Sequence, residues 1–91
     1  MRIAVVKFSD PTTFDRWGTS DEVEKAECYQ CTACGYLIEE TDKVIKVALL
    51  RGQAGRHWSN WVVIPTGAVS SVRIIESVED DDPDTYDLQE S

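Results

Sequence analysis

The chain has 91 residues, with 17 acidic and nine basic side chains and a formal net charge of −8, and this length fits one domain. The charge is uneven, because positions 1–75 hold nine acids and nine bases while positions 76–91 hold the other eight acids and no base. A neutral body argues against bulk electrostatic binding of nucleic acid, and without an apolar run of about 18 residues the sequence predicts no membrane span.

This uneven charge predicts two parts, a structured domain at 1–75 and an acidic tail at 76–91. The tail has too few apolar side chains to form a core, so we expect it to be disordered. Solubility is its main expected role, and the alternatives are mimicry of nucleic-acid phosphate or masking of a basic surface on a host protein. A domain of this size has a core worth on the order of a few kcal/mol, so we expect support from a partner subunit in a homo-oligomer.

The first residues and the cysteine content indicate the compartment. Only about six apolar positions precede Asp10, which is too few for the core of a secretion signal. Three cysteines are an odd number, which suits free or metal-bound thiols in a reducing environment better than a disulfide framework. We therefore expect a cytoplasmic protein.

The first predicted element is a strand at 2–8, where β-branched and aromatic residues are frequent. The segment 11–17 follows an Asp-Pro pair and predicts one short helical turn. That turn would place Phe14 and Trp17 on one side, either as a lid over the core or as a ligand-stacking pair. A T-x-x-E capping box that begins at Thr19 predicts a second helical turn.

The remainder of the body is expected to be strands and turns. The predicted strands are 36–39, 43–51, 61–64 and 69–75. Alternation along the second of them favours Ile45, Val47 and Leu49 as its core face. Five short strands with brief connections predict a mainly β fold, a small five-stranded barrel with one or two helical turns near the N-terminus.

The cysteines form the first candidate site. Cys28, Cys31 and Cys34 are three positions apart, and Gly35 follows the last of them, so the second pair is similar to a zinc knuckle. A structural zinc needs four ligands, which His57 would complete, but three ligands in so short a segment are crowded around one ion. Our main interpretation is buried structural thiols without a cofactor, with zinc and redox chemistry as alternatives.

A second candidate site surrounds the glycine-rich loop at 52–60. Its guanidinium and indole groups can stack a base and neutralise a phosphate, and the loop can wrap a small anion with backbone amides. Alternatively, one tryptophan packs inward and the arginines are solvated, because two tryptophans three positions apart cannot both face the core along a regular strand. The candidate ligand-binding residues are Arg51, Arg56, His57, Trp58 and Trp61.

Catalytic residues are harder to find. His57 is the only histidine, and with Ser59 close in sequence and cysteines elsewhere a Cys–His pair is conceivable. No periodic element places an acid and a base side by side, so we expect no enzymatic activity.

Several short motifs suggest a family. They are Asp10 and Trp17, the segment 34–37 with the Glu-Glu pair after it, the strand 44–49 and the I-P-x-G-A-V run at 64–69. Together, over about residues 6–75, they resemble short proteins encoded by bacteriophages and prophages, which look like Sm-like or SH3-like barrels and mostly lack an assigned activity. The resemblance implies that barrel and a viral setting, but no reaction. Cys28, Cys31 and the acidic tail depart from the pattern.

These observations lead to three hypotheses. The first is a non-catalytic accessory protein that binds a small anionic ligand or a host protein, for example an oligomer that sequesters a nucleotide-type immune signal as counter-defence in the host cytoplasm. The second is an Sm-like binder of single-stranded nucleic acid that uses the same loop. The third is a protein-interaction module stabilised by zinc.

Overall fold

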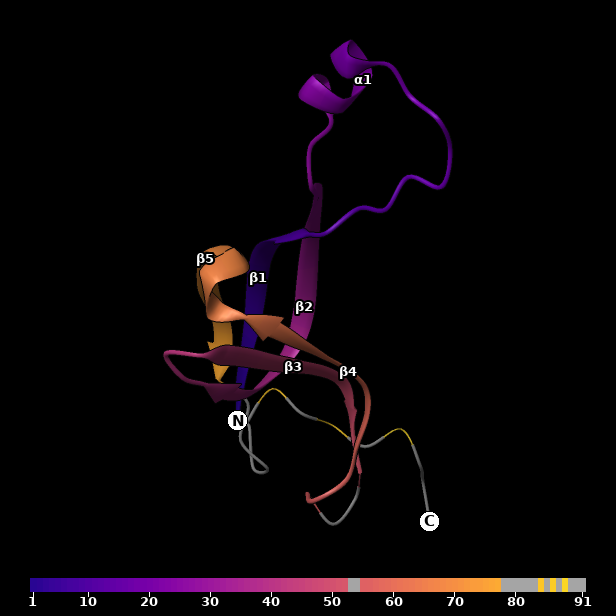
Figure 1. Ribbon diagram of the computed structural model, residues 1–91. Helices are drawn as coiled ribbons and strands as arrows, with labels where there is room; N and C mark the ends of the chain where they lie inside the picture. Colours follow the sequence, from indigo (N-terminus) through magenta and orange to yellow (C-terminus); the bar gives the residue numbers. More distant parts are fainter. Residues whose placement is uncertain (53–54, 78–83, 85, 87, 89–91) are drawn as a thin grey trace.

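The computed structural model describes residues 1–52, 55–77, 84, 86 and 88, and its fold is mainly β (Figure 1). Its elements in chain order are β1 (Arg2–Asp10), α1 (Ser20–Lys25), β2 (Tyr29–Glu40), β3 (Val44–Arg51), β4 (Trp58–Pro65), the 3-10 turn η1 (Thr66–Ala68) and β5 (Val69–Ser77). The prediction of a mainly β fold with five strands is confirmed. No helix in these residues is long and apolar enough to cross a membrane.

The predicted tail at 76–91 falls largely outside the described residues. Its first two positions, Glu76 and Ser77, are described, and they form the end of β5. The strand therefore continues past the point where the excess of acidic residues begins.

All neighbouring strands are antiparallel, and the sheet has the order β4-β3-β2-β1-β5. The first four strands are neighbours both in sequence and in space, whereas β5 returns to pair with β1. Within the described residues no ladder joins β4 to β5, so the sheet is open and has two edges.

The sheet turns sharply along β2. This strand pairs with β1 up to Tyr36 and with β3 from Tyr36 onward, so its two halves serve two different neighbours. Figure 1 shows β3 and β4 running across the direction of β1, β2 and β5. Gly35 lies at the turn, and a Cβ atom there would overlap the carbonyl oxygen of Ala48. The close approach of β3 therefore requires glycine at this position.

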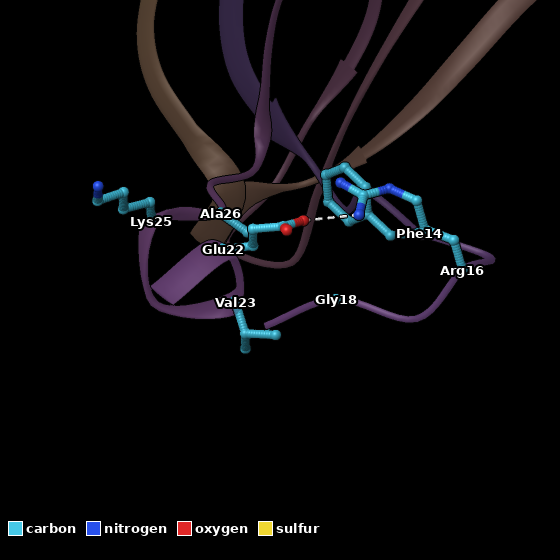
Figure 2. A pocket seen from close by; sticks show the side chains of 7 residues that line it. All are labelled: Phe14, Arg16, Gly18, Glu22, Val23, Lys25 and Ala26. Carbon is cyan, nitrogen blue, oxygen red and sulfur yellow. Dashed lines mark hydrogen bonds and ion pairs between the residues drawn. The ribbon is translucent and has the colours of Figure 1, made fainter. Parts of the chain in front are cut away.

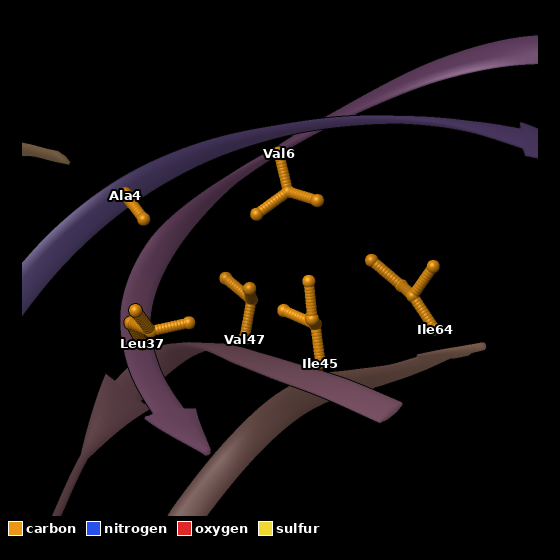
Figure 3. Close-up of a cluster of buried hydrophobic side chains, with 6 residues drawn as sticks. All are labelled: Ala4, Val6, Leu37, Ile45, Val47 and Ile64. Atoms are coloured by element: carbon orange, nitrogen blue, oxygen red, sulfur yellow. The ribbon is translucent and has the colours of Figure 1, made fainter. Parts of the chain in front are cut away.

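Six apolar side chains form the buried core, and they come from four strands. They are Ala4, Val6, Leu37, Ile45, Val47 and Ile64 (Figure 3). In Figure 3, Val6 on β1 faces Ile45, Val47 and Ile64 on the crossing strands, so the core fills the angle between the two halves of the sheet. Burial of each large side chain stabilises the fold by about 2 kcal/mol.

The predicted core face of β3 is partly wrong. Ile45 and Val47 are buried as expected, but Leu49 is 58% exposed. The β3–β4 register is constant but leaves out the pair Leu49 and Asn60, and Asn60 on β4 has a φ of 55°. A residue in this left-handed region interrupts the alternation of the pleat, so strict alternation does not extend to Leu49.

Residues 11–28, which connect β1 to β2 and include α1, extend beyond the sheet, and we call them the arm (Figure 1). The helical turn expected at 11–17 is absent. At the start of α1, the Thr19 hydroxyl accepts the backbone N–H of Glu22 at 3.2 Å, as the capping-box pattern predicts. The Glu22 carboxylate instead pairs with Arg16 at 2.6 Å, so the reciprocal half of the box is replaced by an ion pair.

The expectation that Phe14 and Trp17 cover the core is also wrong. Their exposed fractions are 56% and 99%. The reason is the length of the β1–β2 ladder, which continues to Asp10 opposite Tyr29 and so carries the arm past the core.

Candidate functional site

The most distinctive surface group lies where β2, β3 and β4 are adjacent. Tyr36 is opposite Ala48 on β3, and Ala48 is opposite Trp61 on β4, so the three side chains share one face of the sheet. Ala48 is almost fully buried, whereas Trp61 is 61% exposed. Ala48, a small residue, thus lies between the aromatic residues Tyr36 and Trp61 in a row of side chains that crosses three strands.

Trp58 and Arg51 extend this group toward the β3–β4 loop. The two residues are opposite each other in the ladder, and the Arg51 guanidinium carbon lies 5.8 Å from the centre of the Trp58 ring. The Trp58 ring in turn lies 5.8 Å from the Tyr36 ring, at an interplanar angle of 58°. A cation–π contact of this exposed kind contributes about 0.5–1 kcal/mol. The contacts order Tyr36, Trp58 and Arg51 into one continuous group.

The loop geometry holds Arg51 over this group. The Gly52 N–H donates to the His57 carbonyl oxygen at 2.7 Å, and the Gly55 N–H donates to the Gly52 carbonyl oxygen at 2.9 Å. Gly55 has a φ of 72°, and a Cβ atom there would lie 2.7 Å from an Arg51 guanidinium nitrogen. The guanidinium therefore occupies the space that a side chain at position 55 would need.

The structure brings the predicted ligand-binding residues together only in part. Arg51 and Trp58 are in contact, and Trp61 shares the face of Tyr36. Arg56 and His57 are exposed near the tip of the hairpin. Tyr36 was not predicted, since its place beside Trp58 depends on how β2, β3 and β4 pack together. We call Tyr36, Arg51, Trp58 and Trp61 the aromatic–arginine cluster.

This cluster can bind by stacking and by charge. Its partly exposed rings offer flat apolar faces, and its guanidinium group offers paired donors to a phosphate or carboxylate. No polar or charged side chain among the described residues is buried. The cluster is thus an open binding surface on the sheet.

The cysteine thiols are not grouped as the zinc alternative requires. Cys31 and Cys34 both lie within β2, opposite Phe8 and Val5 of β1, and Cys28 lies just before the strand. Three positions along a strand span about 10 Å and end on opposite faces, so these thiols diverge instead of converging on one ion. Among the described residues, no group of three or more His, Cys, Asp or Glu side chains is placed to hold a metal.

The thiols also differ from the buried side chains that we expected. Cys28 and Cys34 are exposed, Cys31 is half-buried, and all three are free. The Cys-x-x-Cys-Gly sequence is explained differently by the structure: its glycine permits the close approach of β3, and its cysteines are strand residues.

A separate cavity of about 450 Å³ lies within the arm (Figure 2). Its lining residues are Phe14, Arg16, Gly18, Glu22, Val23, Lys25 and Ala26. Figure 2 shows Arg16 beside the Phe14 ring and paired with Glu22, and the guanidinium carbon lies 5.9 Å from the ring centre. Of the pair Phe14 and Trp17, for which ligand stacking was the alternative to a lid, only Phe14 lines this cavity. The other lining residues were not predicted, since the cavity depends on the path of a segment that is mostly not helical.

Comparisons with known proteins identify no relative. No protein-family model matches the chain, and neither the curated proteins nor the solved structures give a significant match. The chemistry of the described side chains is therefore the basis for the function proposed below.

Proposed function

We propose that this chain is a non-catalytic binding protein whose aromatic–arginine cluster takes a ligand with a flat ring and a negative charge, a nucleotide being the simplest example. The observation that carries this proposal is the continuous contact from Tyr36 through Trp58 to Arg51 at the surface. A non-catalytic role is supported by the open surface, because catalytic groups usually lie in clefts that shift their pKa values.

The energetics of such a ligand suit the cluster. Stacking of a base on an aromatic side chain contributes about 1–3 kcal/mol. Trp61 is 61% exposed, so it leaves room for a ring, while Arg51 can meet the phosphate. The two kinds of contact together distinguish a nucleotide from a plain apolar ligand or a plain anion.

We further propose that the curled sheet is a small barrel of the SH3-like or Sm-like type. Four consecutive strands, a fifth that pairs with the first and a tight bend at Gly35 support this proposal, because glycine bends curl a small sheet toward a barrel that can stay partly open. The setting that we propose for it is a phage accessory protein, in which retention of a nucleotide-type immune signal would serve counter-defence in the host cytoplasm.

The test is a titration of the full chain with mononucleotides and cyclic dinucleotides, followed by tryptophan fluorescence and calorimetry. We expect saturable binding that weakens at least about tenfold in Trp61→Ala and in Arg51→Gln, with little change in melting temperature. Tyr29→Ala is the matched control, because it removes an exposed aromatic side chain outside the cluster and outside the arm and should not weaken binding.

Two results would reject the site: absence of saturable binding by the unaltered chain, or equal binding by the cluster variants and the unaltered chain. The unaltered chain should bind a ligand that lacks the phosphate more weakly than the nucleotide. Arg51→Gln should bind the two ligands with equal affinity. This difference separates stacking alone from recognition of charge.

A second candidate is binding of single-stranded nucleic acid by the same cluster. The sequence from 43 to 65 holds four basic residues and no acidic residue, a local excess that could follow a phosphate backbone. This function predicts that oligonucleotides bind better than mononucleotides and that their affinity falls steeply with salt. Equal affinity for mononucleotide and oligonucleotide would exclude it.

A further inference from the structure

The arm carries apolar side chains that its own fold leaves in solvent. Trp17 is 99% exposed, and Phe14 and Val23 are 56% and 69% exposed. Tryptophan is usually highly buried in a folded chain, and exposed groups of large apolar residues mark interaction surfaces. The arm therefore has the composition of a docking segment.

The arm is also acidic. Positions 11–28 hold five acidic residues and two basic residues, a net charge of −3. One of the bases, Arg16, is already paired with Glu22 at 2.6 Å. A partner for the arm should thus combine an apolar surface with positive charge.

The chain itself contains a surface of this kind. We call β3, β4, Lys43 and Arg56 the wing; the sequence from 43 to 65 has a net charge of +4, from four bases and no acid. Trp61 and Val63 are exposed and lie two positions apart on β4, so they share a face. Lys46 lies opposite Val63 in the ladder and pairs with Glu39 at 2.6 Å. Among the described residues, the cations of the wing that have no ion pair are Lys43, Arg51 and Arg56.

The arm of a chain does not reach its own wing. Figure 1 shows α1 and the β3–β4 loop at opposite ends of the molecule. The β1–β2 ladder alone, from Asp10 to Ile3, separates them by about 23 Å. The complementary charges and apolar faces can meet only between two copies.

We propose that the arm of one copy docks on the wing of a second copy, and that the wing of the first receives the arm of the second. Such an antiparallel pair has two-fold symmetry and uses each contact twice, so it closes as a dimer without further growth. Trp17 is the anchor of each contact, and the acidic residues of the arm lie against the bases of the wing.

The acidic C-terminal segment is the other possible occupant of the wing. It supplies eight carboxylates from position 76 onward and three large apolar side chains, Val78, Tyr86 and Leu88, of which one is aromatic. The arm also has three large apolar side chains, but two of them, Phe14 and Trp17, are aromatic, and aromatic residues are enriched at the centre of interfaces.

The first test is the mass of the full chain in solution without nucleotide, measured by sedimentation and light scattering over a concentration series. We expect twice the 10.2 kDa mass of the chain at low salt, with weaker association as salt rises. Trp17→Ala should raise the dimer dissociation constant about tenfold or more, without loss of folding, since this side chain is fully exposed in one copy.

The second test is a reversal of charge on each surface. The arm variant carries Asp15→Lys, Glu24→Lys and Glu27→Lys, and the wing variant carries Lys43→Glu, Lys46→Glu and Arg56→Glu. The arm charge becomes +3 in the first, and the wing charge becomes −2 in the second. Each variant alone should be a monomer, and an equal mixture should form a heterodimer, because both contacts are then attractive.

A monomeric unaltered chain at every concentration would overturn the proposal, as would a dimer that Trp17→Ala leaves intact. Folded charge variants that fail to associate when mixed would also overturn it; circular dichroism shows whether each is folded. The mass measurement needs no nucleotide, so its result does not depend on ligand binding. A dimer can be found even if no nucleotide binds, and nucleotide binding can be found even if the chain is a monomer.

Discussion

The sheet and the arm both contain large aromatic side chains, and they place them in opposite ways. In the sheet, Trp58 is half-buried between Tyr36 and Arg51, whereas Trp17 in the arm is 99% exposed. Strand pairing positions the sheet residues, since Tyr36 pairs with both β1 and β3, and Arg51 is opposite Trp58 on the edge strand β4. The arm has short-range contacts instead, such as the Glu22 N–H that donates to the Thr19 hydroxyl at 3.2 Å. The difference shows that a large aromatic residue is covered here where strand pairing brings other side chains beside it.

The strongest test of this comparison is truncation of a core side chain and of an arm side chain. Ile64 is 1% exposed, and Ile64→Ala should destabilise the fold by about 3–4 kcal/mol through lost contacts and a residual cavity. Val23→Ala, at a position that is 69% exposed, should change the free energy of unfolding by less than about 0.5 kcal/mol. Urea unfolding measures both.

Because a loss of that size is enough to unfold a marginally stable domain, Ile64→Val provides a milder variant. It should cost about 1 kcal/mol and keep the midpoint measurable. Equal effects of the changes at positions 64 and 23 would show that the arm contributes to the core.

Gly35→Ala should have the next largest effect. The added methyl group would meet the Ala48 carbonyl oxygen, and a backbone atom in a ladder cannot move away cheaply, so we expect a loss of about 3 kcal/mol. Gly67→Ala is the matched control, because nothing lies within 4 Å of a Cβ atom there. Thermal unfolding of the two variants should differ clearly, and similar melting temperatures would contradict the close contact at Gly35.

A smaller effect, confined to one helix, is expected in the arm from loss of the α1 cap. Thr19→Ala removes the hydroxyl that accepts the Glu22 N–H and should weaken α1 by about 1 kcal/mol. Because α1 buries no side chain, hydrogen exchange of its amides should speed up while exchange in β1 and β3 stays constant. A matching drop in protection across the sheet would mean that the two regions unfold together.

Local patterns predicted the strands and part of the core. Alternation along 43–51 identified Ile45 and Val47, which are buried, but it could not show that the left-handed Asn60 on the facing strand interrupts the pleat near Leu49. The lid formed by Phe14 and Trp17 was wrong for a related reason. The sequence does not reveal that β1 and β2 stay paired as far as Asp10.

The candidate site was predictable to the extent that its residues are neighbours across one hairpin. Arg51 and Trp58 lie opposite each other on either side of the glycine loop, so their proximity follows from the hairpin alone. Tyr36 required the register of a second ladder. The cysteine spacing was similar to a zinc knuckle, yet Cys31 and Cys34 are strand residues. A glycine after a cysteine pair suits a zinc knuckle, but here it permits the close contact with β3.

The pairing of β1 with β5 has a consequence for the order of folding. Arg2 lies opposite Ser77, so the ladder that completes the sheet joins the two ends of the described body, whereas β3 and β4 are joined by a short loop. Contacts between distant positions cost more loop entropy, so the hairpin of β3 and β4 should form early and the β1–β5 ladder last. On the ribosome, β1 emerges first of the five strands, and its outer neighbour β5 emerges last. During synthesis its unpaired edge is the part of the chain most open to association with other nascent chains.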